Sequence, residues 1–546
     1  MRSGRITLLA AAGCALAGLT ADVGAATAPV IASLTPVSSA NSKSPGIAAP
    51  NVLSKELQEV VAAQGSFKLE NPDPAVGSYG YDTNGPFVPL PAAPTTEASK
   101  TEPDKNTYLV IMGGLAGADP GYGYGTHFLF QGHEGGTIGY LTRINLDADG
   151  AHRVTLLATK DMTGATLPVF DGSTWNPFAG RLLFSAERGS AGGIWDATLD
   201  VPAKVRNLQP FIGRGGFEGM QTDADGNVWI VEDVGGATGT GANSAARRPN
   251  SFVYRFVPND TRDLAQGGKI QALQVLGTGG SPITFNASLN ADQAIFSAGV
   301  AELERCGLSL TTRWITLATT NAASTLPGPD DNALAKAAGA TPFKRPENGQ
   351  FRPGSRFTEF FFDETGDTNA ASSANAGFGG WGSIQRLTLD APGGDTGHLS
   401  LFYASDKSHS GFDNVAFFDR DHISFVEDAG DTLHLQRMAF DSAYLFDVRV
   451  DYSLGDSPIR FIAEGRDAAA TQDNMLAALG NGFQNEGDNE ITGIYMSDGD
   501  ASVGGVLGAK KPLPFHDGWR LFWTQQHGDN VTWEVLPANR VTGDDN

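Results

Sequence analysis

The sequence predicts an all-β protein, and more particularly a six-bladed β-propeller with inserted loops and short helices. The 546-residue chain contains 69 Gly and 29 Pro, and its Val, Thr, Phe and Trp residues fall in short runs, which is typical of many brief strands joined by turns. A repeat supports this prediction, because six short apolar segments each end in an acidic residue or His near a Gly, at irregular spacing. The six segments are THFLFQGHEGG (126–136), GRLLFSAERG (180–189), NVWIVEDVGG (227–236), RFTEFFFDETGD (356–367), HISFVEDAGD (422–431) and WRLFWTQQHGD (519–529).

Two of these segments are near-copies of each other: GNVWIVEDVGG at 226–236 and DHISFVEDAGD at 421–431. When the copies are aligned without a gap, Glu218 lies opposite Asp413, and each of them follows Gly-Phe. The segment that enters the innermost strand of a blade lies near the central axis, so equivalent carboxylates from several blades are expected to converge there. Comparable positions are held by Asp171, Glu347 and Glu490.

Converging carboxylates repel one another unless a cation lies between them, and carboxylate oxygens are the ligands that Ca²⁺ prefers. The overall charge agrees, because 61 Asp and Glu against 38 Lys and Arg give a net charge of −23. This balance repels nucleic acid and anionic lipid and concentrates divalent cations, so calcium is the expected partner and nucleic acid is not. Each carboxylate taken singly can also be a solvated turn residue or a structural hydrogen-bond acceptor.

The N-terminal residues 1–26 have the pattern of a signal peptide. MRSGR supplies positive charge, ITLLAAAGCALAGL is an apolar run of the right length, and small residues surround Ala25. The sequence therefore predicts export, to the periplasm or the medium. Cys14 lacks the Leu expected in a lipidation motif, and Cys306 is the second of only two Cys, so no intramolecular disulfide is expected after cleavage.

Residues 27–101 form an extension rich in Ala, Pro and Ser, with a helix-like piece, SKELQEVVAAQG, at 54–65. Residues 102–546 then form the propeller domain. Long inserts are expected around 237–340 and 432–486, and ADQAIFSAGVAELERCG (291–307) is predicted to be an amphipathic helix that ends at its Gly. No apolar run after the signal peptide is long enough to span a bilayer.

An ordered set of short motifs resembles the PhoX-type alkaline phosphatases, from about Lys105 to Asn530. The resemblance implies an exported propeller enzyme that hydrolyses phosphate monoesters with calcium and iron ions held by Glu, Asp and Cys. The motifs are GHE (132–134), NPFAGRLLFSAE (176–187), GRGGFEG (213–219), RRPNSFVYRFVP (247–258), GATPFKRPENG (339–349), FDNVAFFDRDHISFVED (412–428), NEITG (489–493) and LFWTQQHGDN (521–530).

The same resemblance implies roles for individual residues. Arg345 resembles the arginine that holds the phosphate, and a guanidinium fork suits two phosphoryl oxygens. The chain departs from the family where FDGSTW has no Cys; if Asp171 replaces it, an all-oxygen site favours calcium and leaves iron and catalytic activity open. The metal carboxylates that the resemblance implies are Glu187, Glu218, Glu347 and Asp413.

Three functions remain open from the sequence. The first is a metal-dependent phosphatase that takes a small-molecule phosphate ester and acts as a monomer. The second is a calcium-dependent lactonase-type propeller, and the third is a non-catalytic, calcium-stabilised binding propeller. Arg345 distinguishes the first from the second, because a lactone needs no guanidinium to hold it.

Overall fold

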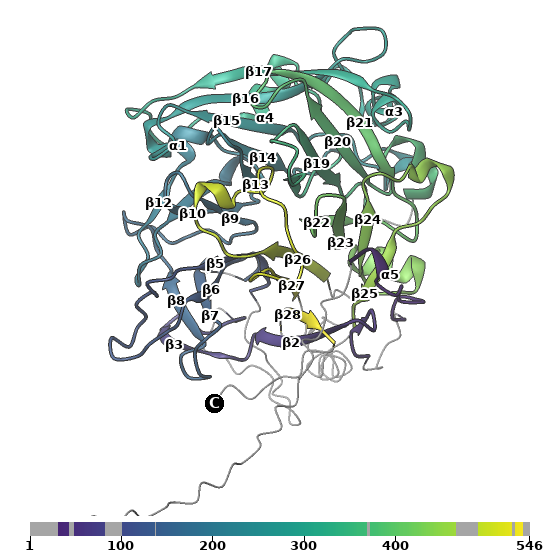
Figure 1. Ribbon diagram of the computed structural model, residues 1–546. Helices are drawn as coiled ribbons and strands as arrows, with labels where there is room; N and C mark the ends of the chain where they lie inside the picture. The colour runs from purple at the N-terminus through teal and green to yellow at the C-terminus, as the bar shows by residue number, and fades with distance from the viewer. Residues whose placement is uncertain are drawn as a thin grey trace, which may run out of the picture.

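Antiparallel sheets follow one another around a central region, so the chain is all-β with a propeller-like arrangement (Figure 1). The predicted signal peptide, with Cys14, lies outside the described residues. In the described part of the chain, no helix is long and apolar enough to cross a membrane. The computed structural model describes residues 31–42, 49–81, 101–136, 138–368, 372–465, 490–526 and 530–538.

Two four-stranded antiparallel sheets come first along the chain, with the orders β5-β6-β7-β8 and β12-β11-β10-β9. In the first sheet, nearly all residues of the strands are buried, as expected where both faces of a sheet pack against neighbours. The strands are β5 (Pro103–Val110), β6 (His127–His133), β7 (Leu141–Asn145), β8 (Val154–Ala158), β9 (Ser173–Asn176), β10 (Arg181–Ala186), β11 (Gly193–Ala197) and β12 (Val205–Asn207).

A nine-stranded sheet follows, in which β17 pairs with both β16 and β21 and so joins two four-stranded units. The expected insert at 237–340 is too wide, because it contains β15 and β16, which are regular members of the first unit. The strands are β13 (Phe217–Thr222), β14 (Val228–Glu232), β15 (Val253–Pro258), β16 (Gly268–Val275), β17 (Leu310–Thr319), β18 (Gly349–Phe351), β19 (Glu359–Glu364), β20 (Ser383–Leu389) and β21 (Thr396–Ala404).

The last two large sheets each include a strand from near the N-terminus: β1 pairs with β25, and β2 pairs with β28. The expected insert at 432–486 is also too wide, because it contains β24 and β25, which are regular members of a sheet. The strands are β22 (Phe412–Phe417), β23 (His422–Glu427), β24 (Ser442–Asp447), β25 (Ile459–Ala463), β26 (Glu490–Ser497), β27 (Arg520–Gln526), β28 (Val531–Pro537), β1 (Val52–Leu53), β2 (Leu57–Ala63) and the separate pair β3 (Lys68–Asp73) and β4 (Val76–Ser78).

The helix predicted at 54–65 is wrong, since this stretch forms β2. Its Leu57, Val60 and Val61 have helical spacing, but β-branched side chains also suit a strand, and pairing with β28 satisfies the backbone hydrogen bonds. The single helix predicted at 291–307 is two short helices, because Ser297 caps the second one. The α-helices are α1 (Gln209–Ile212), α2 (Ala291–Ile295), α3 (Ala298–Leu303), α4 (Asp331–Ala338) and α5 (Gly430–Arg437).

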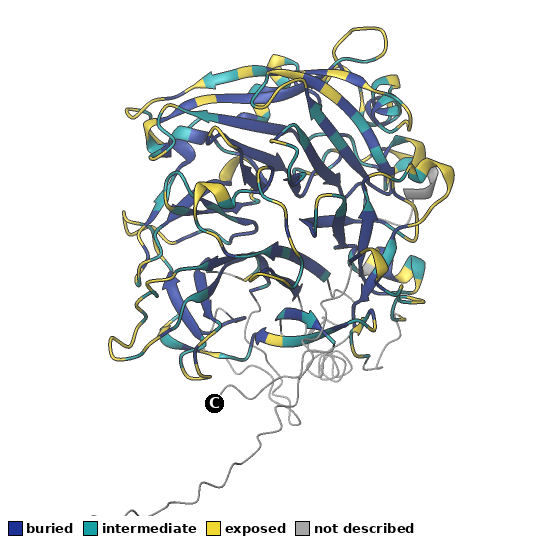
Figure 2. Cartoon of the chain, in the orientation of Figure 1, coloured by how far each residue is buried: buried dark blue, intermediate teal, exposed yellow. Residues whose placement is uncertain are grey.

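All six segments of the predicted repeat contain a strand. These strands are β6, β10, β14, β19, β23 and β27. Each is the second strand of its sheet or unit, counted from β5, β9, β13, β18, β22 or β26, and each pairs with a strand on both sides. Figure 2 shows that their residues are buried, whereas exposed residues lie mainly on the loops and outer strands. The repeat in the sequence is therefore a repeat in the sheets.

The hairpins before the two Val-Glu-Asp copies pair their strands in the same register, with Phe217 opposite Glu232 and Phe412 opposite Glu427. Asp223 Oδ1 accepts the backbone N–H of Asp225 at 2.9 Å and of Asn227 at 3.0 Å. In the other copy, Asp419 Oδ1 accepts the N–H of Asp421 at 2.7 Å and of His422 at 2.8 Å. An Asp that bonds to the backbone ahead of it fixes a tight turn. The two turns differ by one residue, although the strands that they join share a register.

Candidate metal centre

The strands nearest the centre each bring a carboxylate to one end of the central region. Four of these residues lie at the start of a strand, Asp104 on β5, Glu218 on β13, Asp413 on β22 and Glu490 on β26. Asp171 and Glu347 lie two residues before β9 and β18.

These inner strands approach one another closely, and glycine makes this possible. A Cβ at Gly219, directly after Glu218, would lie 2.7 Å from the Cα of Asn348. A Cβ at Gly172, directly after Asp171, would lie 2.4 Å from the carbonyl oxygen of Glu218. Any larger residue would push the strands apart, so the glycines set the spacing of the carboxylates.

The carboxylates form two groups whose oxygen atoms are close enough to share a metal ion. Asp104, Glu134 and Asp171 offer ligand atoms that all lie within 4.8 Å of one another. Glu218, Glu347 and Asp413 form the second group, within the same limit. Both groups offer only oxygen, which suits a hard cation such as Ca²⁺.

Two of these carboxylates have an oxygen that is buried and has no hydrogen-bond partner in the described part of the chain. They are Asp171, through Oδ1, and Glu218, through Oε2. Burial, and then the neighbouring carboxylates, raise the pKa of both groups well above the ordinary values. A buried carboxylate oxygen without a donor is costly, and a bound cation would remove that cost.

A second set of acidic residues directly follows the strands of the repeat. Glu134 follows β6, Glu187 follows β10, Asp233 follows β14 and Asp428 follows β23. Burial, and then the charge of Asp233 and Glu134, raise the pKa of Glu187. Burial, and then Asp441, raise the pKa of Asp428 to about 6. Asp233 and Asp428 are the last residues of the two Val-Glu-Asp copies, so the motif itself reaches the site.

Arg345 lies among these acids in a fixed orientation. Its Nε donates to both oxygens of Asp233 at 2.9 Å, its Nη2 donates to Asp233 Oδ2 at 2.6 Å, and its Nη1 donates to Thr368 Oγ1 at 3.2 Å. Its Nη2 is 3.7 Å from Glu347 Oε1. Burial opposes the charge, but Asp233 and Glu347 outweigh it and raise the pKa of Arg345. The guanidinium is therefore charged, with one N–H left on each terminal nitrogen.

Arg345 opens onto a pocket of about 330 Å³ whose wall includes Asp428 of the second set. Asp428, Glu490 and Glu347 lie on its wall together with small side chains, so polar groups dominate its surface. The remaining lining residues are Thr365, Thr368, Ala429, Gly430 and Thr432.

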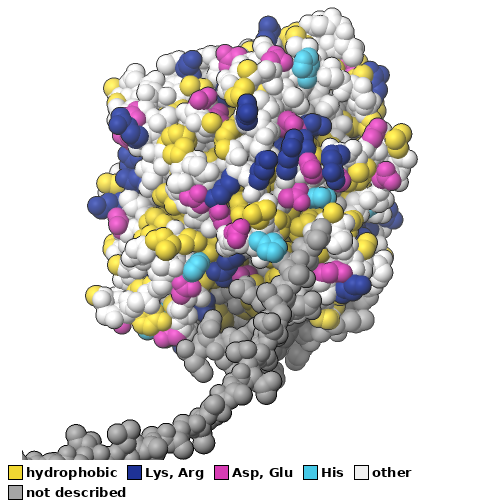
Figure 3. All heavy atoms as spheres, viewed as in Figure 1, with side chains coloured by type: hydrophobic (Ala, Val, Ile, Leu, Met, Phe, Trp, Pro, Cys, Tyr) yellow, Lys and Arg dark blue, Asp and Glu magenta, His cyan; other side chains and the backbone are white. Residues whose placement is uncertain are grey.

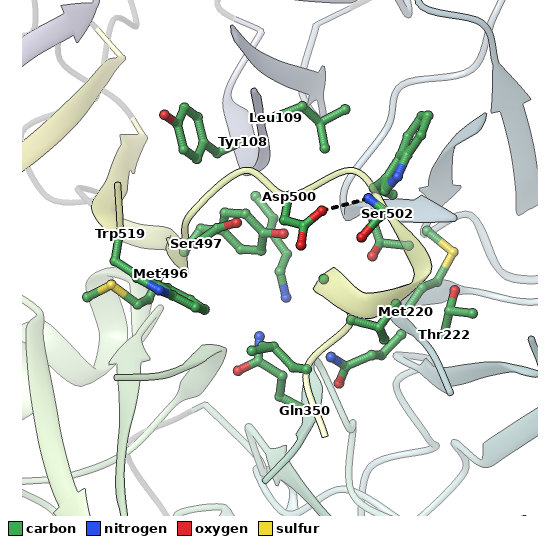
Figure 4. Close-up of a pocket in the computed structure, with 18 of the residues that line it drawn as sticks. Tyr108, Leu109, Met220, Thr222, Gln350, Met496, Ser497, Asp500, Ser502 and Trp519 are labelled. Carbon is green, nitrogen blue, oxygen red and sulfur yellow. Dashed lines mark hydrogen bonds between the residues drawn. The ribbon is translucent and has the colours of Figure 1, made fainter. Parts of the chain in front are cut away.

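The opposite end of the central region is covered by the segment after β26. Lys510 forms ion pairs with Asp498 and Asp500, and Asp500 Oδ1 accepts the N–H of Ser502 at 2.9 Å. Beneath this segment lies a cavity of about 60 Å³, and Figure 4 shows Gln350, Met496 and Trp519 around it. On the face shown in Figure 3, acidic and basic side chains are mixed, without a patch of one sign.

The structure brings together all the residues proposed from the sequence. Asp171 lies in the first acidic group, Glu218, Glu347 and Asp413 form the second, Glu187 interacts with Asp233 and Glu134, and Glu490 shares the pocket with Arg345. Sequence reasoning missed Asp104, Glu134, Asp233 and Asp428. Three of the four have a signal in the sequence, since they follow the repeated strands; Asp104 has none.

The Glu of each Val-Glu-Asp copy has another role. Glu232 Oε2 accepts hydrogen bonds from Tyr254 Oη at 2.8 Å and from Asn332 Nδ2 at 2.9 Å. Glu427 Oε1 accepts from the N–H of Ser410 at 3.0 Å and from Arg437 Nη1 at 2.8 Å. These Glu side chains hold neighbouring segments in place, whereas the Asp side chains face the site.

A family model described as "Alkaline phosphatase PhoX" matches residues 243–503. This match confirms the resemblance of the chain to the PhoX-type alkaline phosphatases. The matched region holds Arg345, Glu347, Asp413, Asp428 and Glu490. No curated protein matches the chain.

Solved structures with some similarity to the chain include a luciferin-regenerating enzyme, at 8% identity and a TM-score of 0.36, covering 80% of this chain and 92% of that one. TolB from Acinetobacter baumannii has 8% identity and a TM-score of 0.27, covering 79% and 63%. Lignostilbene dioxygenase from Pseudomonas brassicacearum has 9% identity and a TM-score of 0.30, covering 92% and 93%. At these scores none of them carries an argument about function.

Proposed function

We propose that this chain is an exported, metal-dependent phosphatase of the PhoX type that hydrolyses small-molecule phosphate monoesters at the axial end of a six-bladed β-propeller. The six blades would be the four-stranded sheets and units that begin with β5, β9, β13, β18, β22 and β26, the last completed by β2. The single observation that carries the function is the position of Arg345, which is fixed by Asp233 beside two groups of buried carboxylates.

The carboxylates fit a divalent cation, and calcium fits better than iron. The acidic residues of the site far outnumber Arg345, so without added cations they would repel one another and remain partly protonated. No hydrogen-bond donor reaches Asp171 Oδ1 or Glu218 Oε2 from the described residues, as expected for oxygens that would hold a metal. Neither acidic group includes the soft thiolate that would favour iron, and the free Cys306 is exposed. A bound divalent cation would lower the pKa of water and neutralise charge on a phosphoryl group.

Arg345 would bind the phosphoryl group from the pocket. Asp233 occupies the Nε side of the guanidinium, so the two remaining N–H groups on Nη1 and Nη2 are available to a pair of phosphoryl oxygens. Charge on those oxygens must be stabilised as the bond to the leaving group breaks, and a preorganised charged donor does this without rearranging. Asp233 would thus position Arg345 rather than contact the substrate.

The decisive test is kcat/KM for a simple aryl phosphate and for a lactone, measured on the wild type and on Arg345→Ala in the presence of Ca²⁺. We expect turnover of the phosphate by the wild type and a loss of about 10²–10³ in the variant, as when one charge-stabilising donor is removed. Arg345→Lys retains the charge without the fork and should recover only part of the rate.

Turnover of the lactone but not of the phosphate would support the lactonase-type propeller instead. No turnover of either, with calcium bound, would support the non-catalytic binding propeller. Unchanged phosphate turnover in Arg345→Ala would contradict the role of Arg345.

A further inference from the structure

Lys105 is a buried cation on the closed side of the carboxylates. It lies on β5, only 4% of its surface is exposed, and its side chain contributes to the wall of the 60 Å³ cavity. Burying an ammonium without an anionic partner is costly, so its neighbours must supply negative charge. Burial lowers the pKa of Lys105, and the nearby carboxylates of Asp413, Asp104, Asp363 and Glu218 oppose that shift.

A single side chain connects Lys105 to the second acidic group. Lys105 Nζ donates to Asn348 Oδ1 at 2.9 Å, and Asn348 Nδ2 donates to Glu218 Oε1 at 3.0 Å. The same Nδ2 is 3.5 Å from Asp413 Oδ1. The backbone N–H of Asn348 donates to Asp363 Oδ1 at 2.8 Å, which fixes the main chain that carries the side-chain amide.

The carboxylates therefore lie between two fixed cations. Arg345 is on the side of the open pocket, and Lys105 is on the side of the closed cavity. The two are held differently, because Arg345 is bound directly by Asp233, whereas Lys105 acts on Glu218 through Asn348. Arg345 lines the 330 Å³ pocket, and Lys105 does not.

We propose that Lys105 is a fixed counter-ion of the metal centre: its ammonium takes the place of one further cation on the closed side and, through Asn348, positions Glu218 as a metal ligand. Lys105 is thus a positioning residue and not a catalytic one. The inference rests on the proposed metal site, but it does not depend on phosphatase activity.

The test is the calcium content of Lys105→Met and Lys105→Arg, stripped with chelator, dialysed against Ca²⁺ and compared with the wild type by elemental analysis. We expect more calcium per chain in Lys105→Met and the wild-type amount in Lys105→Arg, which keeps the charge. Lys344→Met is the matched control, since it removes an ammonium that is equally buried but paired with Asp367. It should lower stability without changing the calcium content.

Wild-type calcium content and affinity in a folded Lys105→Met would overturn the proposal. A Lys105→Met protein that folds only when Ca²⁺ is present would support it, because the ion then replaces the ammonium. A protein that stays unfolded even in Ca²⁺ would contradict it, because charge would then not be what Lys105 supplies.

Asn348→Ala tests the connection separately, because Lys105 keeps its charge. We expect calcium affinity, measured by titration calorimetry, to fall about 10–100-fold with an unchanged number of ions, as when an outer partner of a ligand is lost. Unchanged affinity would refute the link through Asn348. If the wild type binds calcium but turns over no phosphate, the proposed function fails while these binding results still decide the role of Lys105.

Discussion

The two Val-Glu-Asp copies occupy equivalent strands, β14 and β23, yet their acids make different contacts. Asp233 binds Arg345 through three hydrogen bonds, whereas Asp428 lines the pocket beside Glu490. Their Glu neighbours differ too, because Glu232 accepts from neutral donors and Glu427 accepts from Arg437.

This difference shows how a repeated strand can acquire separate functions. The shared register of the two hairpins fixes where the two Asp residues lie, and the segment that packs opposite each copy determines which contacts they make. Arg345 comes from the segment before β18 and, of the two Asp residues, hydrogen-bonds to Asp233. The entering carboxylates Glu218 and Asp413, by contrast, have kept the same role, since they meet in one acidic group.

The largest expected effect comes from Glu218 and Asp413, the carboxylates that hold equivalent positions before the two Val-Glu-Asp copies. Glu218→Ala and Asp413→Ala should each weaken calcium binding by more than the roughly 10–100-fold that loss of an outer partner costs, because each variant removes a ligand oxygen. The melting temperature in Ca²⁺ should fall as well, by mass action on the native state. Calorimetric titration of stripped protein measures the first effect.

Asp223→Ala and Asp419→Ala are the matched controls, because they alter the turns of the same two hairpins without touching the site. Both controls should keep wild-type calcium affinity. If Glu218→Ala also binds calcium like the wild type, the two copies do not share a metal site.

The next effect distinguishes the Asp residues of the two Val-Glu-Asp copies by their influence on kcat/KM. Asp233→Asn should lower kcat/KM for an aryl phosphate about 10–100-fold with unchanged calcium content, because Arg345 loses the charged partner that orients it. Asp428→Asn should lower kcat/KM less, because Arg345 hydrogen-bonds to Asp233 and Thr368, and no hydrogen bond joins it to Asp428 in the described part of the chain. Equal losses in the two variants would show that Asp233 has no special relation to Arg345.

A smaller effect is expected from the two Glu residues. Glu427→Gln should destabilise the fold by about 1–3 kcal/mol, because Arg437 loses a charged acceptor in a buried place. Glu232→Gln should cost less, because its partners are neutral and an amide oxygen can accept from them. Chemical denaturation at pH 7 and constant Ca²⁺ compares the two; a larger cost at Glu232 would reverse this assignment.

The last effect is the pH dependence of stability at Glu232. Burial raises the pKa of Glu232 to about 7, with its hydrogen bonds opposing the shift. A folded-state pKa above the unfolded value means that this group favours folding below about pH 4.5 and loses that contribution as the pH rises through 7. The stability of Glu232→Gln relative to the wild type should therefore increase from pH 4.5 to 8. A constant difference across that range would contradict the raised pKa.

Much of the fold could be predicted because strand composition and turn residues repeat along the chain. The repeat located six strands correctly, and the offset from Val-Glu-Asp located Glu218 and Asp413. β2 could not be predicted, because Leu57, Val60 and Val61 fit a helix and a strand alike, and only pairing with a strand near the C-terminus decides between them.

The site was harder to predict than the fold. Successive residues at a strand end point in opposite directions, and the sequence does not say whether Glu232 or Asp233 faces the axis. Asp104 is the second residue of β5, the first strand of the ring, and shares no offset with the repeat. Lys105 follows Asp104 and belongs to no motif. It meets Asn348 only because the fold brings together two segments that are far apart in the sequence.

The most direct test of the account combines metal analysis with activity on the same sample. Protein purified without chelator is analysed for calcium and iron, stripped, assayed with an aryl phosphate, and assayed again after Ca²⁺ is restored. For a calcium-dependent phosphatase we expect bound calcium with little iron, no turnover after stripping, and recovery of turnover with Ca²⁺ alone. Full turnover by stripped protein, or tightly bound stoichiometric iron that calcium cannot replace, would contradict it.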